Sequence, residues 1–149
     1  MIKILFVCHG NICRSTMAEY VMKHLVKQAG REEEFYIDSA ATSREEIGNG
    51  VHHGTKRKLA QMGVPCGNHR ARQMTRADYE EFDLLIGMDN ANIRNMARIA
   101  GGDDEGKIHR MLDYTNRPGE VADPWYTGDF DETWDDVLEG CTGLLAQLN

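Results

Sequence analysis

The segment that follows the first apolar run of the chain carries two residue types that could act on an oxyanion, a cysteine and an arginine. It reads Cys8-His9-Gly10-Asn11-Ile12-Cys13-Arg14-Ser15. A loop wound tightly between a strand and a helix turns its backbone N–H groups inward, and the helix N-terminus adds partial positive charge. Gly10 and Asn11 are residue types that accept positive φ angles, which such a loop requires. The segment therefore predicts an anion-binding loop.

The side chains of this loop suit phosphoryl transfer. The planar guanidinium of Arg14 can chelate two oxygens of a phosphoryl group. Donors that bind an anion also stabilise a sulfur anion, so the sequence predicts that Cys8 is a thiolate at neutral pH. A nucleophile and an anion cradle in one segment favour transfer through a phosphocysteine, with stabilised charge on the equatorial oxygens.

Strands and helices alternate along the chain. Residues 2–7 form an apolar run that suits a central parallel strand. A helix is expected just after Arg14, with a capping box from Thr16 to Glu19 and an end at Gly30. Further strands are predicted at 35–39, 83–88 and 107–112, and further helices at 55–62, from the Asp89 cap to Gly101, and at 130–148.

This order of elements predicts the fold class. Strands that alternate with helices form βαβ units, so we expect an α/β fold with a four-stranded parallel sheet flanked by helices on both faces. Ligands of such sheets bind beyond the carboxyl ends of the strands, where the strand order reverses. The loop after the first strand is therefore the expected site.

The composition narrows the class of protein. The chain has 149 residues, 41% of them hydrophobic, which is enough for the core of one domain. A formal net charge of −7 argues against nucleic acid or a membrane surface as a partner. The absence of a signal-like or spanning apolar stretch predicts a cytoplasmic protein. Residues 103–149 carry −9 and the first 102 carry +2, so an anionic ligand is expected in the N-terminal two-thirds.

The cysteines and histidines give little sign of a metal site. Four cysteines without a Cys-x2-Cys pair favour reduced thiols and no metal. Cys66 and Cys141 are expected to be buried or half-buried thiols. His52 and His53 are expected in an exposed loop rather than in a metal site.

Residues 7–19, Val-Cys-His-Gly-Asn-Ile-Cys-Arg-Ser-Thr-Met-Ala-Glu, resemble the signature of the low-molecular-weight protein tyrosine phosphatases. The similarity continues in order through 38–43, 47–49, 69–73, 82–83 and 123–126. It covers nearly the whole chain and implies a single domain over 1–149, with the flavodoxin-like fold of the phosphotyrosine phosphatase I type. It also implies hydrolysis of phosphotyrosine in proteins and of small aryl phosphates without a cofactor or metal, and inhibition by phosphate and related oxyanions.

The resemblance implies roles for individual residues. Cys8 would be the nucleophile, and Arg14 would clamp the phosphate within the loop 8–14. Asp123 would protonate the leaving tyrosyl oxygen and would then act as the base that activates water. A supporting hydrogen-bond network would come from Asn11, Ser15, Ser39 and His69. Within it Ser15 would donate to the Cys8 thiolate, and His69 is not expected to be catalytic. The pocket wall would consist of Ile12, Glu45, Trp125 and Tyr126.

Local chemistry agrees with an acid at Asp123. Pro124 restricts the preceding residue to extended backbone, which fixes the direction of the carboxyl group. A carboxyl group beside a bound dianion is expected to keep its proton because like charges repel. Asp129 is the alternative acid.

Two positions of the resemblance raise separate expectations. Cys13 is the family's second thiol, which implies a reversible disulfide with Cys8 that protects the nucleophile from over-oxidation. Glu45 departs from the family, because many members carry an aromatic or aliphatic residue there on the pocket wall. An acidic residue facing the pocket would make its rim more polar and would change the peptide preference.

Four alternative functions share a loop of this kind or a similar one. Protein arginine phosphatases resemble this chain but carry Thr where Ile12 stands, so Ile12 favours phosphotyrosine. Arsenate reductases need a further cysteine pair, and residues 67–140 contain none. A phosphocysteine carrier of a sugar transport system needs neither the Arg14 clamp nor an acid at Asp123. An anion-binding module without turnover is the fourth alternative.

Overall fold

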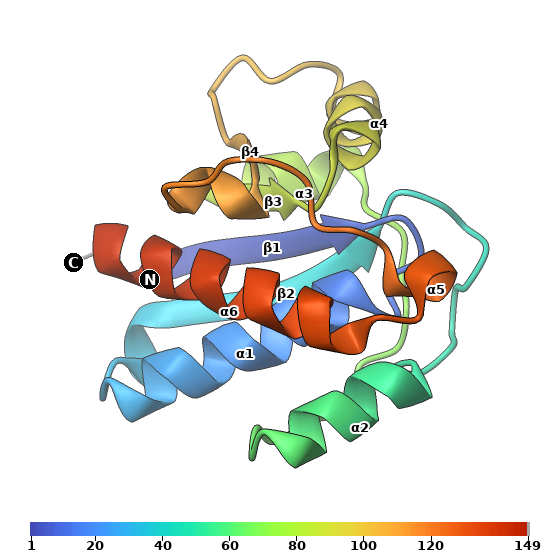
Figure 1. The fold of residues 1–149 in the computed structure, drawn as a ribbon. Helices are drawn as coiled ribbons and strands as arrows, with labels where there is room; N and C mark the ends of the chain where they lie inside the picture. Colours follow the sequence, from blue (N-terminus) through green and yellow to red (C-terminus); the bar gives the residue numbers. More distant parts are fainter. Residues whose placement is uncertain (149) are drawn as a thin grey trace.

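A parallel sheet lies at the centre of the structure, a computed structural model that describes residues 1–148 (Figure 1). Its strands are β1 (Ile2–Cys8), β2 (Phe35–Ala41), β3 (Leu84–Gly87) and β4 (Ile108–Arg110). They lie in the order β2-β1-β3-β4, and every pair is parallel. The strand order reverses beside β1, because β2 lies on one side of it and β3 on the other. The predicted four-stranded parallel sheet is confirmed.

Helices cover both faces of the sheet, as predicted. On one face lie α1 (Arg14–Gln28), α2 (His53–Gln61) and α6 (Phe130–Gln147), and on the other lie α3 (Arg76–Glu81) and α4 (Asn90–Ala100) (Figure 1). The long helices α1 and α6 pack on each other as well as on the sheet.

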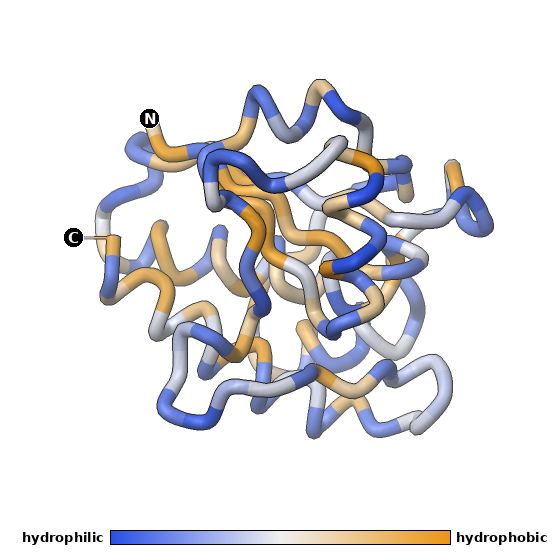
Figure 2. Tube along the Cα trace, turned by 90° about the horizontal axis from the view of Figure 1, so that it is seen from above, coloured by the Kyte–Doolittle hydropathy of each residue, from blue (hydrophilic) through white to orange (hydrophobic). Residues whose placement is uncertain are grey.

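Two hydrophobic clusters form the core, one on each face of the sheet. Successive side chains of a strand point to opposite faces, so β1 contributes to both. Ile4 and Phe6 lie in the cluster with α1 and α6, whereas Leu5 and Val7 lie in the cluster with α3 and α4. Figure 2 shows hydrophobic segments gathered in the interior and hydrophilic segments in the outer loops. This double burial explains why residues 2–7 read as a continuous apolar run.

The start of α1 differs from the prediction. The helix begins at Arg14, and the side chain of Thr16 does not cap it. Instead Thr16 Oγ1 donates to the carbonyl oxygens of Ile12 and Cys13, at 2.9 and 3.0 Å. The preceding loop runs directly into the helix, so Thr16 satisfies loop carbonyls. Glu19 takes no part in a cap and is buried on the sheet side.

The other elements follow the sequence closely where local signals are strong. The Asp89 side chain accepts from the backbone N–H of Asn92 and caps α4, and Gly101 ends this helix in the left-handed conformation, as predicted. The short helices α3 and α5 (Pro124–Thr127) were not predicted. Helices of six and four residues are too short to show a period of 3.6.

Two smaller expectations need correction. Cys66 is exposed, whereas Cys141 is buried as predicted. His53 is exposed but begins α2, and His52 is half-buried and caps this helix, so only part of the predicted loop exists.

Candidate active site

The loop between β1 and α1 curls around the backbone of Asn11. Asn11 has a φ of 60°, and no other non-glycine residue in 1–148 has a positive φ. The prediction for Asn11 is therefore confirmed, but the prediction for Gly10 is wrong, because Gly10 does not adopt a positive φ. A left-handed non-glycine residue costs free energy, which the surrounding bonds must offset.

Those bonds come from the amide side chain of Asn11, which is fully buried. Its Nδ2 donates to Ser15 Oγ at 2.8 Å and to Ser39 Oγ at 2.9 Å. Its Oδ1 lies 2.8 Å from His69 Nε2 and accepts from the backbone N–H of Arg72 at 3.2 Å. The predicted supporting residues therefore meet at one side chain, although they come from α1, β2 and the segment after α2.

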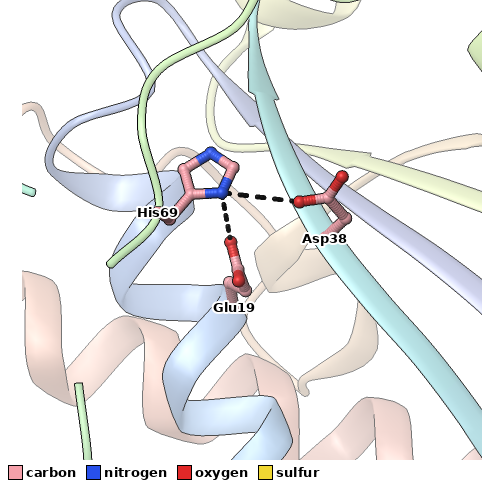
Figure 3. A group of neighbouring side chains, drawn as sticks. All are labelled: Glu19, Asp38 and His69. Atoms are coloured by element: carbon pink, nitrogen blue, oxygen red, sulfur yellow. Dashed lines mark ion pairs between the residues drawn. The ribbon is translucent and has the colours of Figure 1, made fainter. Parts of the chain in front are cut away.

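The network continues away from the loop to a carboxylate on α1. Ser39 Oγ donates to Glu19 Oε1 at 2.5 Å, and Lys23 Nζ lies 2.6 Å from Glu19 Oε2. His69 Nδ1 lies 3.5 Å from both Glu19 Oε1 and Asp38 Oδ1 (Figure 3). The sequence did not predict that Glu19 extends this network. Its position three residues after Thr16 indicates a capping box, and its position four residues before Lys23 is typical of an ion pair on a helix surface.

The same three side chains could offer one ligand atom each to a metal ion. These atoms of Glu19, Asp38 and His69 lie within 4.8 Å of one another. Each carboxylate already faces a cation: Lys23 for Glu19, and Arg72 at 3.2 Å for Asp38. The charge of the cluster is therefore balanced by protein groups.

The sulfur of Cys8 lies at the floor of the loop. Cys8 is buried at the end of β1, and its Sγ lies 3.1 Å from Ser15 Oγ. The backbone N–H of Asn11 donates to this sulfur at 3.3 Å. In the contact with Ser15, the Cys8 thiol donates to the hydroxyl oxygen; once the thiol has lost its proton, the Ser15 hydroxyl and the N–H of Asn11 can both donate to the sulfur and stabilise its negative charge.

Arg14 is buried although it is the largest charged side chain of the loop. Its exposed fraction is 2%. One terminal nitrogen, Nη1, donates to Asp89 Oδ2 at 2.7 Å and to the carbonyl oxygen of Val121 at 3.0 Å, and Nη2 donates to Asp123 Oδ2 at 3.3 Å. The Nε atom is buried and has no hydrogen-bond partner among residues 1–148. A bound oxyanion would supply the acceptor that this N–H lacks.

Neighbouring groups keep the buried guanidinium of Arg14 protonated. Burial lowers the pKa of its guanidinium, but the Cys8 sulfur and the carboxylates of Asp89 and Asp123 outweigh burial and raise the pKa above its ordinary value. The role of Asp89 as an anchor of Arg14 was missed by sequence reasoning, which explained this residue fully as a helix cap. Its place directly after a predicted strand was the signal that could have found it, since such ends share one edge of the sheet.

Asp123 reaches the loop from the segment before α6. Its backbone is extended, with φ −81° and ψ 112°, as expected for a residue before proline. Its Oδ1 accepts from the backbone N–H of Trp125 at 3.1 Å, and Oδ2 faces Arg14. The alternative acid, Asp129, instead caps α6 by accepting from the N–H of Glu132 at 2.9 Å. The structure thus brings Asp123 to the anion-binding loop.

A cavity of about 110 Å³ opens above Cys8. Its mouth is exposed, since Trp125 and Tyr126 have exposed fractions of 58% and 82%. The predicted wall residues all contribute to the lining, which consists of Cys8, His9, Gly10, Ile12, Cys13, Glu45, Glu46, Asp123, Trp125 and Tyr126. This volume is large enough for a phosphoryl group and leaves the remainder of an ester at the mouth.

The acidic residue that departs from the resemblance lies at this mouth. Glu45 Oε2 pairs with His9 Nε2 at 2.8 Å, and both side chains are exposed. Ser43 donates from its backbone N–H and from Oγ to the carbonyl oxygen of His9, at 3.1 and 2.8 Å. Residues 43–46 are therefore bonded at His9 to the loop 8–14. We call residues 43–46 the rim segment, and we call residues 8–14 the phosphate loop after their expected ligand.

The second thiol of the loop differs from the first. Cys13 is buried, and burial together with the nearby Cys8 sulfur raises the pKa of the Cys13 thiol to about 12. Cys13 is therefore protonated at neutral pH, and both thiols are free.

Comparison with known proteins agrees with the fold and identifies the family. The model of the family "Low molecular weight phosphotyrosine protein phosphatase" matches residues 3–149. The chain belongs to this family, and it is accordingly a protein-tyrosine phosphatase, a hydrolase of phosphate esters. No helix within residues 1–148 is long and apolar enough to cross a membrane.

Three relatives illustrate the similarity. The low molecular weight protein-tyrosine-phosphatase YfkJ of Bacillus subtilis is 40% identical, over 99% of this chain and 96% of its own length, and its crystal structure superposes with a TM-score of 0.96. The phosphatase SP-PTP of Streptococcus pyogenes is also 40% identical, with a TM-score of 0.90 over 100% of this chain and 94% of its own. An arginine phosphatase of Drosophila is 29% identical, with a TM-score of 0.91 over 99% and 98%.

Proposed function

We propose that the chain hydrolyses phosphotyrosine in proteins and small aryl phosphates through a phosphocysteine formed on Cys8. The observation that carries the proposal is that Cys8 and Asp123 line one cavity, while the buried guanidinium of Arg14 donates a hydrogen bond to the carboxylate of Asp123 at 3.3 Å. Strand β1, the N-terminus of α1 and the segment before α5 bring these groups together at the carboxyl edge of the sheet.

In the first step the Cys8 thiolate attacks phosphorus, and the bond from phosphorus to the aryl oxygen breaks. Asp123 gives its proton to that oxygen as it leaves. Arg14 and the N–H groups of the loop hold the charge on the equatorial oxygens, where such interactions lower the barrier most.

In the second step the Asp123 carboxylate takes a proton from water while the water oxygen attacks phosphorus. The phosphorus–sulfur bond breaks, the thiolate of Cys8 returns, and inorganic phosphate leaves. Ser15 eases the departure of the sulfur, since its hydroxyl lies 3.1 Å from Sγ and can donate to the anion. No step requires a metal or a cofactor.

Replacement of the nucleophile tests this mechanism. Cys8→Ser is expected to abolish hydrolysis of p-nitrophenyl phosphate while phosphate still binds, because the loop donors remain. Asp123→Asn is expected to slow hydrolysis by about 10²–10⁴-fold. Rapid quenching of this variant with an aryl phosphate should reveal a phosphorylated Cys8 by mass spectrometry; a phosphorylated residue elsewhere would contradict the mechanism.

Phosphoarginine is the second candidate substrate. Three carboxylates, those of Glu45, Glu46 and Asp123, line the cavity and could face a cationic guanidinium leaving group. Ile12 favours phosphotyrosine because it adds an apolar surface beside the leaving group. Rates on phosphotyrosine, phosphoarginine and arsenate measured side by side decide between the candidates, and a preference for phosphoarginine would overturn the first.

We further propose that Cys8 and Cys13 form a reversible disulfide on oxidation. Both thiols line the same cavity, and each is free in this structure. Intact-mass analysis after peroxide treatment should show the loss of two hydrogen atoms from these cysteines, because peroxide takes up two electrons and two protons as it is reduced to water. Persistent sulfinic acid on Cys8 would contradict the proposal. The cytoplasmic location stays a prediction.

A further inference from the structure

The N-terminus of α2 is bonded to the phosphate loop. The backbone N–H of His52 donates to the carbonyl oxygen of Ile12 at 2.9 Å, and Thr55 Oγ1 donates to that of Cys13 at 3.2 Å. These two carbonyls belong to the last residues before Arg14. The segment 52–55 therefore fixes the far side of the loop that holds the phosphate.

The side chain of His52 faces the other half of the site. Its ring stacks on Phe130 at the start of α6, with centroids 5.4 Å apart and planes 21° apart. It meets Trp125 edge-on, at 5.7 Å and 80°. Trp125 is more than half exposed and lines the mouth of the cavity two residues after Asp123. An exposed side chain keeps one orientation only when a neighbour restrains it, and the His52 ring is such a neighbour.

Close packing holds the His52 ring in place. Gly54 lies so near Phe130 that a Cβ atom at this position would come within 2.4 Å of the Phe130 ring. Lys58 Nζ pairs with Asp131 Oδ1 at 2.7 Å across the same junction of α2 and α6. The start of α2 is thus clamped to the start of α6, with the His52 ring beside the contact.

We propose that His52 is a positioning residue for the aryl-binding wall. The ring of His52 holds Trp125 over the cavity, and the backbone N–H of His52 holds the phosphate loop. The proposal rests on the proposed function, because it assumes that the wall receives an aryl group. It makes His52 the physical link between the part of the site that binds phosphate and the part that binds the leaving group.

The neutral form of the imidazole is the one that fits this position. Its Nδ1 accepts from the backbone N–H of Gly54 at 3.0 Å, which requires that Nδ1 carry no proton. Burial and the stacked ring of His53 lower the pKa of His52, whereas the carboxylates of Glu46 and Asp123 act in the opposite direction without reversing the shift.

His52→Asn tests the proposal, because asparagine keeps the backbone N–H and caps a helix well but has no ring. Inhibition by inorganic phosphate is expected to change less than twofold. Inhibition by benzylphosphonate is expected to weaken about 3- to 10-fold, the range of an edge-to-face aromatic contact, and the KM of p-nitrophenyl phosphate should rise by a similar factor with kcat nearly constant. The proposal would be overturned if inhibition by phosphate and by benzylphosphonate weakened equally, or if neither weakened.

A double-mutant cycle ties the effect to the wall. Trp125→Ala alone should weaken benzylphosphonate, and His52→Asn should add little in the Trp125→Ala background. Additive losses would overturn the proposal, since they would mean that His52 acts through another group. His24→Asn is the matched control, because His24 lies on α1 and has no ring contact with His52 or Trp125 within residues 1–148.

A readout without catalysis separates this proposal from the proposed function. The chain has two tryptophans, and replacing the buried Trp134 by Phe leaves Trp125 as the fluorescent probe. His52→Asn should lower the fluorescence anisotropy of Trp125, and His24→Asn should not. Unchanged anisotropy would overturn the positioning role even in an active enzyme, whereas a lower anisotropy in a chain that hydrolyses no aryl phosphate would overturn the proposed function alone.

Discussion

The phosphate loop and the rim segment lie side by side but are built differently. In the loop, Asn11, Arg14 and Ser15 are buried and every one makes side-chain hydrogen bonds. In the rim segment, Glu45 is exposed and pairs with an exposed histidine. Buried polar groups require their partners, whereas exposed ion pairs contribute little free energy. The loop is therefore held in one geometry, whereas the rim segment is less constrained.

Substituting Arg14, the proposed phosphate clamp, should give the largest effect. In Arg14→Lys the point charge remains, but the planar fork that binds two oxygens is lost. We expect kcat/KM for p-nitrophenyl phosphate to fall by about 10³-fold or more. The variant must first be shown to unfold at a similar temperature. A decrease in kcat/KM of less than tenfold would mean that a point charge at position 14 suffices and that the planar fork is not needed.

Removing the centre of the network should reduce stability as well as activity. Asn11→Ala deletes an amide with four partners at a backbone position with positive φ. We expect the free energy of unfolding to fall by about 2–4 kcal/mol, as measured by urea titration. Asn11→Gly loses the amide but relieves the backbone, so it should recover about 1 kcal/mol of this loss. Equal free energies of unfolding in both variants would show that the positive φ at position 11 costs no stability.

Neutralising the rim should have a small effect that depends on salt. Glu45→Gln removes a negative charge from the mouth of a site that binds a dianion. The KM of p-nitrophenyl phosphate should fall by no more than about threefold at low salt, and the difference should vanish near 1 M salt because charges are then screened. Glu33→Gln, exposed on another surface, is the control. A decrease in kcat beyond tenfold would place Glu45 among the groups that act on the reaction.

The smallest effect concerns His52, which joins the phosphate loop to Trp125 at the mouth of the cavity. Because the pKa of His52 is lowered in the folded state, the unfolded chain binds a proton first as the pH falls below about 6.5. The neutral His52 therefore favours the folded state fully above pH 6.5, and this contribution to the free energy of unfolding is lost as the pH falls towards the pKa of His52 in the folded chain. The loss of thermal stability between pH 7.5 and 5.5 should be smaller in His52→Asn than in the parent chain. An equal loss would mean that other groups cause it.

The sequence by itself determined the elements and the chemistry that depend on neighbours along the chain. The apolar run of β1, the cap at Asp89, the left-handed Asn11 and the extended Asp123 before Pro124 were all predicted, because each follows from the local preferences of one or two residues. The resemblance to a known family supplied the functional roles that local chemistry alone left open.

The tertiary structure decided which distant residues meet. Asp89 anchors Arg14 from 75 positions away, and Glu19 turns from the predicted cap to Ser39 on β2. His52 joins the phosphate loop to Trp125, although the sequence predicted an exposed loop there. Such pairs depend on the strand order β2-β1-β3-β4 and on the packing of α2 against α6, and neither leaves a periodic signal in the sequence.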